Sequence, residues 1–152
     1  MLKNKTAVVT GGSRGIGYAI GKKFLENGAN VALFGSRQET VEKAIAKLKE
    51  ENPEYPVIGL WPDLNDLASV SEAFEKVKET FGSLDILANN AGVSSSTSLY
   101  DYKPGEFEKV MNLNVNAVFT CAHAAAPIMR EQGGGVIINT SSMVSIYGQP
   151  SG

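Results

Sequence analysis

Five short runs of hydrophobic residues recur along the chain, and each run is nearly continuous instead of alternating with polar residues. Continuous runs rich in branched side chains are typical of strands that are buried on both faces of a parallel sheet. The predicted strands are Thr6–Thr10, Asn30–Phe34, Tyr55–Leu60, Leu84–Ala88 and Gly135–Asn139.

The segments between these runs have hydrophobic residues at every third or fourth position, which predicts helices. Their apolar positions are Ile16, Ala19, Ile20 and Phe24; then Val41, Ala44, Ile45 and Leu48; then Leu67, Val70, Phe74, Val77 and Phe81; and finally Phe107, Val110, Met111, Asn114, Val118, Cys121, Ala125 and Met129. Regular alternation of strand and helix predicts a parallel sheet with helices on both faces, joined by right-handed crossovers. The expected fold is a doubly wound, Rossmann-like α/β fold.

Length and composition narrow the class of protein. A chain of 152 residues is expected to form a single domain, here residues 1–152. The net charge of -2 gives no reason to expect a nucleic-acid or anionic membrane partner. With one cysteine and one histidine, no internal disulfide and no metal cluster are expected, and the reducing cytoplasm is the expected compartment.

The candidate chemistry lies just after the strands, because ligands of such sheets bind outside the carboxyl ends. The runs are followed by "TGGSRGIG" from Thr10, "GSR" from Gly35, "WPDL" from Trp61, "NNAG" from Asn89 and "TSS" from Thr140. All five segments are therefore expected along one rim of the sheet.

The first of these segments has glycines with the spacing G-x-x-x-G-x-G at Gly11, Gly15 and Gly17. Glycines there allow a tight turn, a close approach of the backbone to a pyrophosphate, and the first helix then offers its free N–H groups to phosphate. A turn of this kind can also serve packing alone. Its place between a strand and an amphipathic helix favours dinucleotide binding.

The end of the second strand distinguishes the two nicotinamide cofactors. About twenty residues beyond the glycine loop, a carboxylate indicates NAD, whereas an arginine indicates NADP. The sequence here is Gly35, Ser36 and Arg37, and Arg14 can approach the same phosphate from the glycine loop. These residues predict NADP(H), with NAD(H) possible. The alternative is that Arg37 is a solvated residue that begins the second helix.

Taken in order, "TGGSRGIG", "DL" at Asp63, "NNAG", "NLNVNAVF" from Asn112 and "GVIINTSS" resemble the signature of the short-chain dehydrogenase/reductase family in its compact single-domain form. The resemblance covers the whole chain. In the residue pattern of these motifs, the sequence is most similar to bacterial enzymes that act on steroid or bile-acid hydroxyls, and second most similar to the 3-oxoacyl-carrier-protein reductases.

The resemblance implies an oxidoreductase that uses NADP(H) to interconvert a secondary alcohol and a ketone, of hydroxysteroid or 3-oxoacyl type, as a homotetramer. It implies that Ser142 holds the substrate oxygen and that Asn114 anchors a water in a proton relay. The cofactor-binding residues that it implies, together with those inferred above, are Gly11, Ser13, Arg14, Gly15, Ile16, Gly17, Ser36, Arg37, Asp63, Leu64, Asn90, Ala91 and Gly92. Asp63 and Leu64 would hold the adenine, and Asn90 to Gly92 would line the ribose.

Several of these residues have simpler interpretations. Asn114 lies on the apolar stripe of its helix, so its amide is expected to be buried and hydrogen-bonded, as in a structural asparagine. A serine such as Ser142 can serve a turn or a helix cap. Trp61 is expected to be a packing residue, Cys121 an inert core thiol, and His123 a surface or interface histidine.

The family also supplies a Tyr-x-x-x-Lys pair, whose lysine lowers the tyrosine pKa for acid and base catalysis. In the family, the tyrosine lies about thirteen residues beyond the serine, and that count from Ser142 passes Gly152 by about three. Two hypotheses follow. The sequence is the N-terminal portion of a longer reductase, incomplete at its C-terminus and inactive alone, or it is a non-catalytic nucleotide-binding module.

Overall fold

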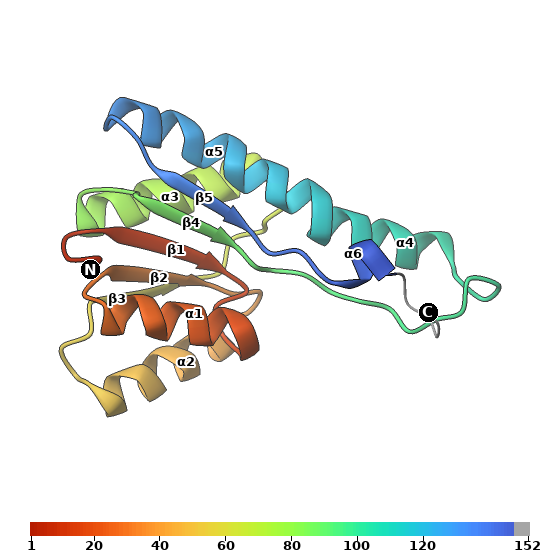
Figure 1. Ribbon diagram of the computed structural model, residues 1–152, viewed down its shortest axis with the longest axis horizontal. Coiled ribbons are helices and arrows are strands. Elements are labelled where there is room, and N and C mark those ends of the chain that lie inside the picture. The colour runs from red at the N-terminus through yellow and green to blue at the C-terminus, as the bar shows by residue number, and fades with distance from the viewer. Residues whose placement is uncertain (148–152) are drawn as a thin grey trace.

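The computed structural model describes residues 1–147 and contains a five-stranded, fully parallel sheet with the order β3-β2-β1-β4-β5. The predicted doubly wound fold is confirmed (Figure 1). The strands are β1 (Thr6–Thr10), β2 (Asn30–Phe34), β3 (Val57–Leu60), β4 (Ile86–Asn89) and β5 (Val136–Asn139). The order reverses at β1, and a crevice for ligand is expected at such a point.

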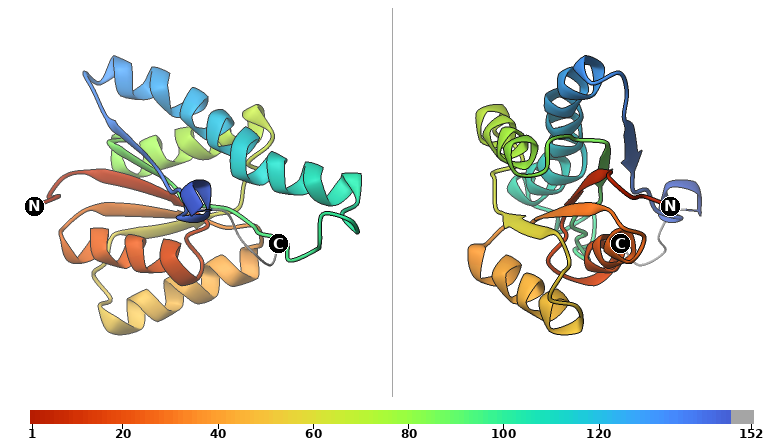
Figure 2. Two further views of the ribbon diagram at one scale, coloured as in Figure 1. Left: turned by 45° about the vertical axis from the view of Figure 1, so that its right-hand side comes forward. Right: turned by 90° about the vertical axis from the view of Figure 1, so that its left-hand side faces the viewer.

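The helices cover both faces of the sheet, as Figures 1 and 2 show. They are α1 (Gly15–Glu26), α2 (Gln38–Glu51), α3 (Leu67–Phe81), α4 (Pro104–Met111), the π-helical turn η1 (Asn112–Asn116), α5 (Ala117–Glu131) and α6 (Val144–Tyr147). The predicted long fourth helix is therefore α4, η1 and α5 in succession. Within residues 1–147, none of these helices combines the length and the apolar character that crossing a bilayer requires.

Two hydrophobic cores hold the layers together, one on each face of the sheet. On one face, α3 and α5 pack on β1, β2 and β4 around Phe34 and Phe74, whose ring centroids are 5.5 Å apart. On the other face, residues of α1 and α2 such as Leu25 and Leu48 pack on Val31 and Leu33 of β2. The central strands are thus buried on both sides, as their continuous hydrophobic runs predict.

The expectation of burial is wrong for β5 and for α4. Val136 of β5 is 54% exposed, and its neighbours Ile137 and Ile138 are also exposed, because in the described part of the chain β5 pairs with β4 alone. In α4 no residue is buried, and the apolar side chain of Phe107 is exposed. Figure 1 shows the reason, since α4 extends beyond the carboxyl end of the sheet and leaves the layers that would cover it.

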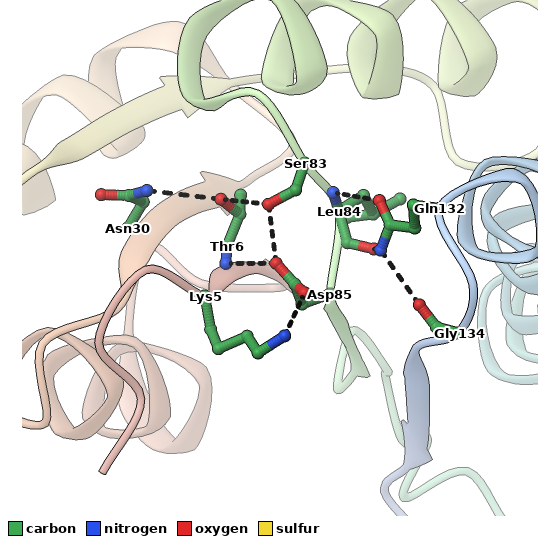
Figure 3. Close-up of polar contacts among 8 residues, drawn as sticks. All are labelled: Lys5, Thr6, Asn30, Ser83, Leu84, Asp85, Gln132 and Gly134. Carbon is green, nitrogen blue, oxygen red and sulfur yellow. Dashed lines mark hydrogen bonds and ion pairs between the residues drawn. The ribbon is translucent and has the colours of Figure 1, made fainter.

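A polar cluster joins the strands at the amino end of the sheet (Figure 3). The Asp85 carboxylate accepts hydrogen bonds from Lys5 Nζ at 2.8 Å, from the Thr6 backbone N–H at 2.9 Å and from the Ser83 hydroxyl at 2.7 Å. Burial raises the pKa of Asp85, but the bonds from Lys5, Ser83 and Thr6 outweigh it and leave the pKa below its ordinary value. This cluster connects β1 to the start of β4.

Candidate functional site

A cavity of about 750 Å³ lies at the carboxyl ends of the strands. Its volume is within the range of small-molecule and cofactor sites. It is lined by Gly11, Ser13, Arg14, Gly15, Ile16, Gly17, Phe34, Gly35, Ser36, Trp61, Pro62, Asp63, Leu64, Asn65, Asn90, Ala91, Gly92, Val93, Leu113 and Thr140. The wall includes every residue that the sequence predicted for cofactor binding except Arg37, and it does not include Asn114 or Ser142.

The glycine loop has the close contacts that its spacing predicts. Gly11 and Gly15 have φ angles of 65° and 55°, which L residues with a Cβ rarely adopt. A Cβ on Gly17 would lie 2.6 Å from Asn90 Nδ2 and would also collide with the Gly11 carbonyl. A Cβ on Gly15 would meet nothing within 4 Å, so this glycine serves the turn and not the packing.

The N-terminus of α1 opens at this loop without a capping side chain or an acidic residue in its first turn. By contrast, Asp66 caps α3 by accepting a hydrogen bond from the Ala68 N–H at 3.0 Å. Free N–H groups and the positive end of the helix dipole favour an anion. The glycine cradle and the uncapped helix therefore fit the pyrophosphate of a dinucleotide.

Thr10 joins the glycine loop to the segment after β4. Its hydroxyl oxygen accepts hydrogen bonds from the backbone N–H groups of Asn90 and Ala91, each at 3.0 Å, and its carbonyl accepts one from Asn90 Nδ2 at 3.2 Å. Sequence reasoning missed Thr10 because a threonine that ends a strand carries no signal of a contact 80 residues away. The Thr10 side chain therefore holds the glycine loop and the segment after β4, which form two walls of the cavity, together.

The ends of β2 and β3 form a further part of the cavity. The Gly35 N–H donates to the Leu60 carbonyl at 3.0 Å, which places Ser36 and Trp61 on neighbouring segments of the wall. Arg37 lies off the wall and begins α2, where its carbonyl accepts a hydrogen bond from the Thr40 hydroxyl at 2.8 Å. Glu39 is the first acidic residue after Arg37 in the sequence, and its carboxylate forms an ion pair with Lys43 at 2.7 Å. The rim here presents Arg14 and Ser36, and among residues 1–147 the only carboxylate on the cavity wall is that of Asp63.

The Asp63 backbone is held in place independently of any ligand. Its N–H donates to the Ser69 hydroxyl at 3.0 Å, and its carboxylate accepts a hydrogen bond from the Asn65 N–H at 3.0 Å. The carboxylate is exposed at the cavity, so its second oxygen can accept a hydrogen bond from a ligand. Leu64 beside it supplies an apolar surface.

Asn114 has the hydrogen bonds that were expected but not the burial. The residue is exposed, because η1 lies beyond the sheet together with α4. Its amide makes two bonds of 2.8 Å with Val93, accepting from the backbone N–H and donating to the carbonyl. The side chain thus ties η1 to the segment after β4, immediately next to Gly92 on the cavity wall.

Ser142 is exposed, and its contacts in residues 1–147 are those of a turn that begins α6. Its hydroxyl accepts a hydrogen bond from the Val144 N–H at 3.4 Å, and its carbonyl accepts one from the Ser145 hydroxyl at 2.6 Å. The interpretation of Ser142 as a turn or capping serine therefore describes these contacts. A substrate-holding role for Ser142 stays a prediction.

Two hydrogen bonds hold the end of β5 to β4, one between side chains and one between backbone groups. Asn89 Nδ2 donates to Asn139 Oδ1 at 3.0 Å, and the Thr140 N–H donates to the Asn89 carbonyl at 2.9 Å. These bonds bring Thr140 onto the cavity wall, with Ser142 two residues further along. Thr140 and Leu113 lie in segments that the sequence analysis named, but neither residue was assigned to the site, since a helix stripe or a strand end does not reveal which side chains reach a cavity.

Two remaining residues have no part in the cavity. Cys121 is buried in the core of α5, and burial raises the pKa of its thiol to about 12. His123 is exposed on α5 and stacks on Phe119 with ring centroids 5.7 Å apart. Among residues 1–147, no set of three or more His, Cys, Asp or Glu side chains is arranged to hold a metal ion.

The protein is of the doubly wound α/β class, with a glycine cradle at the end of β1 that fits a dinucleotide, and comparison with known proteins identifies its family. Residues 5–152 match the family described as short chain dehydrogenase, and the chain belongs to this family.

Its relatives include a 3alpha-hydroxysteroid dehydrogenase of Mediterraneibacter gnavus, which is 64% identical over 152 residues, or 100% of this chain and 61% of the relative. A 3-oxoacyl-[acyl-carrier-protein] reductase of Staphylococcus aureus is 36% identical over 99% of this chain and 61% of its own length. A solved structure from Sinorhizobium meliloti 1021, described as a short-chain alcohol dehydrogenase, matches with a TM-score of 0.90 and 32% identity over 99% of this chain and 59% of that protein. The chain thus spans about three fifths of the length of these relatives.

Proposed function

We propose that the protein is an NADP(H)-dependent oxidoreductase that interconverts a secondary alcohol and a ketone, and that residues 1–152 are its dinucleotide-binding domain. The observation that carries the proposal is the cavity at the end of β1, where the glycine cradle and the uncapped N-terminus of α1 meet. The names of the relatives support the reaction class.

Three sets of residues on the cavity wall would hold different parts of the cofactor. Gly11, Ser13, Gly15, Ile16 and Gly17 would surround the pyrophosphate, and Asn90, Ala91 and Gly92 would line the adenosine ribose. Asp63 would accept a hydrogen bond from the adenine amino group, with Leu64 against the ring. The bound cofactor supplies hydride chemistry, and the chain supplies its position and orientation.

On the substrate side, Asn114 would orient a water molecule while its amide holds Val93 in place. Ser142 would donate its hydroxyl proton to the substrate oxygen, which is compatible with the hydroxyl oxygen accepting from the Val144 N–H. Beside it, Met143 and Ile146 present exposed apolar side chains. Such a surface suits the apolar body of a hydroxysteroid better than a charged metabolite.

The preference for NADP over NAD rests on Arg14 and Ser36, which lie on the wall, and on Arg37, which lies just outside it. Cationic and hydroxyl donors stabilise a 2′-phosphate dianion, and a carboxylate at this point would repel it. We therefore expect Arg37→Asp to weaken NADPH binding about tenfold or more while NADH binding is kept or improved.

Titration calorimetry of the wild type and Arg37→Asp with NADPH and NADH tests this assignment. An unchanged NADP preference in Arg37→Asp would assign the 2′-phosphate to Arg14 and Ser36 alone. Arg14→Ala provides the comparison, since it should weaken NADPH binding whether or not Arg37 takes part.

The second candidate function is a nucleotide-binding module without catalysis. The observation behind it is that no residues between Ser142 and Gly152 form a Tyr-x-x-x-Lys pair, whereas Tyr18 and Lys22, which have this spacing, lie in α1 before the serine. We expect the purified chain to bind NADPH but not to oxidise it in the presence of a 3-oxosteroid. Detectable turnover would exclude this candidate. Reading the native transcript past the codon for Gly152 tests the alternative, in which the Tyr-x-x-x-Lys pair follows within a few residues.

We further propose a cytoplasmic homotetramer. The free, buried thiol of Cys121 fits a reducing compartment. Exposed apolar side chains run along one helical segment from Phe107 through Met111 and Val115 to Phe119, which is 70% exposed. A contiguous surface of this kind is typical of a contact between subunits. Sedimentation equilibrium is expected to give a larger assembly for the wild type than for Phe119→Lys.

A further inference from the structure

Trp61 is the single tryptophan of the chain, and only a packing role was expected for it from the sequence. The structure places it directly after β3 and on the wall of the cavity. Its side chain remains 44% exposed, although most large hydrophobic side chains of the sheet layers are buried. An aromatic residue left open at a cavity is available to contact a ligand.

Three segments of the wall converge at Trp61. Its predecessor Leu60 accepts a hydrogen bond from the Gly35 N–H at 3.0 Å, which sets Trp61 beside the end of β2. The Ser13 hydroxyl lies 3.2 Å from the position that a Cβ of Gly35 would take, so the glycine loop reaches the same place. Trp61 therefore lies where the phosphate-facing loop and the ends of β2 and β3 meet.

The side chains around this point separate into a polar and an apolar part. Arg14 and Ser36 offer donors for phosphate, whereas Pro62, Leu64 and the Trp61 indole offer apolar surface. A group that carries phosphates and a flat aromatic base would satisfy both parts. Bases pack readily on aromatic side chains, because every base presents a π face.

We infer that Trp61 is a cofactor-binding residue whose indole packs against the adenine base of the dinucleotide. The inference rests on the proposed function and deepens it, since it adds to the adenosine end of the cofactor a residue for which the sequence predicted packing alone. Stacking on an aromatic residue changes affinity by about tenfold.

Adenosine 2′,5′-bisphosphate is a suitable probe, because it contains the base and the 2′-phosphate without the nicotinamide. Its affinity is measured by calorimetry for wild type, Trp61→Phe, Trp61→Leu and the control Tyr100→Leu, which removes an aromatic ring that lies outside the cavity wall. Trp61→Leu should bind about tenfold more weakly than the wild type. Trp61→Phe should weaken the affinity by less than about threefold, because its ring can still pack against the base, and Tyr100→Leu should match the wild type.

The fluorescence of the single tryptophan gives a second readout that needs no substitution. Adenosine 2′,5′-bisphosphate is expected to quench Trp61 on binding, whereas inorganic pyrophosphate, which has no base, should leave the emission nearly unchanged. This measurement stands even if a Trp61 variant fails to fold.

The outcomes separate the inference from the function on which it rests. If wild type binds NADPH but Trp61→Leu binds the bisphosphate within twofold of wild type, or if saturation leaves the fluorescence unchanged, Trp61 is a packing residue and the proposed function stands. If wild type binds neither NADPH nor the bisphosphate, both the proposed function and the inference are wrong.

Discussion

Gly17 lies where the glycine loop, α1 and the segment after β4 come into contact. The backbone of Gly11 and the Asn90 amide approach so closely that a Cβ at residue 17 would have no space. Asn90 is itself held by Thr10, so it cannot move aside without breaking that contact. The glycine is needed for packing as well as for its approach to phosphate.

We predict that Gly17→Ala destabilises the fold by about 1–3 kcal/mol, as overpacking in a close-packed region does, and removes most NADPH binding. Gly105→Ala is the matched control, because a Cβ there meets nothing within 4 Å. Urea unfolding and NADPH titration of both variants check this. Equal stability and affinity for Gly17→Ala and wild type would show that the loop differs from the one described.

Asp85 is the residue whose charge connects strands at the other end of the sheet. Its pKa is lowered in the folded protein, so the carboxylate is favoured there more than in the unfolded chain. The stability that it contributes is present at neutral pH, declines below the ordinary carboxyl value of about 4, and is lost once the pH passes the lowered folded value.

Asp85→Asn should therefore cost about 1–3 kcal/mol at pH 7, the usual worth of hydrogen bonds to a charged group, and progressively less toward pH 3. The free energy of unfolding in urea at several pH values measures the difference. Asp101→Asn, at an exposed aspartate without an ion pair in residues 1–147, is the control and should show little change. A difference that does not vary with pH would contradict this role of the charge.

At the scale of elements, η1 and the segment after β4 depend on one side chain. Asn114 satisfies both backbone groups of Val93, and the π-helical turn lies between α4 and α5 at this position. π-helical turns inside α-helices are frequent at functional sites. The contact holds the wall residues Gly92 and Val93 against the helix.

We predict that Asn114→Ala accelerates hydrogen exchange of the Val93 amide by about tenfold or more, because the two lost hydrogen bonds contribute roughly 1 kcal/mol each. NMR exchange rates provide the measurement. In Asn116→Ala the exchange should stay near the wild-type rate, because the Asn116 side chain bonds Asn112 and not the loop. Equal rates in Asn114→Ala and wild type would mean that the loop is held by other contacts.

Strands and helices were largely predictable, because burial in a parallel sheet leaves continuous runs such as Val31 to Phe34 and because helices show their period. The burial of Asn114 was predicted wrongly. An apolar stripe indicates a covered face only where the helix lies over a layer, and α4 and η1 lie beyond the sheet. Both segments that begin at Thr10 and Trp61 were expected at this rim, but the contacts of Thr10 and the open position of Trp61 were not predicted. Neither chain position nor residue type shows which distant backbone or cavity a side chain meets.

At the scale of the whole molecule, the two ends of the sheet have different roles. The amino end is closed by the Asp85 cluster and by Gln132, which bonds the Leu84 backbone through both of its amide atoms (Figure 3). The carboxyl end is open, with Arg14, Ser36 and the uncapped α1 around the cavity. The fixed end supports the strands whose other ends form the candidate site.

The central claim is that this chain forms a nicotinamide-dinucleotide site at the carboxyl end of β1. Titration of the purified protein with NADPH and with NADH, at one salt concentration, tests it most directly. The predicted result is saturable binding, tighter for NADPH, with a stabilisation of about 2.7 kcal/mol at a hundredfold excess over Kd. Absence of binding by either dinucleotide to the folded protein would contradict the claim.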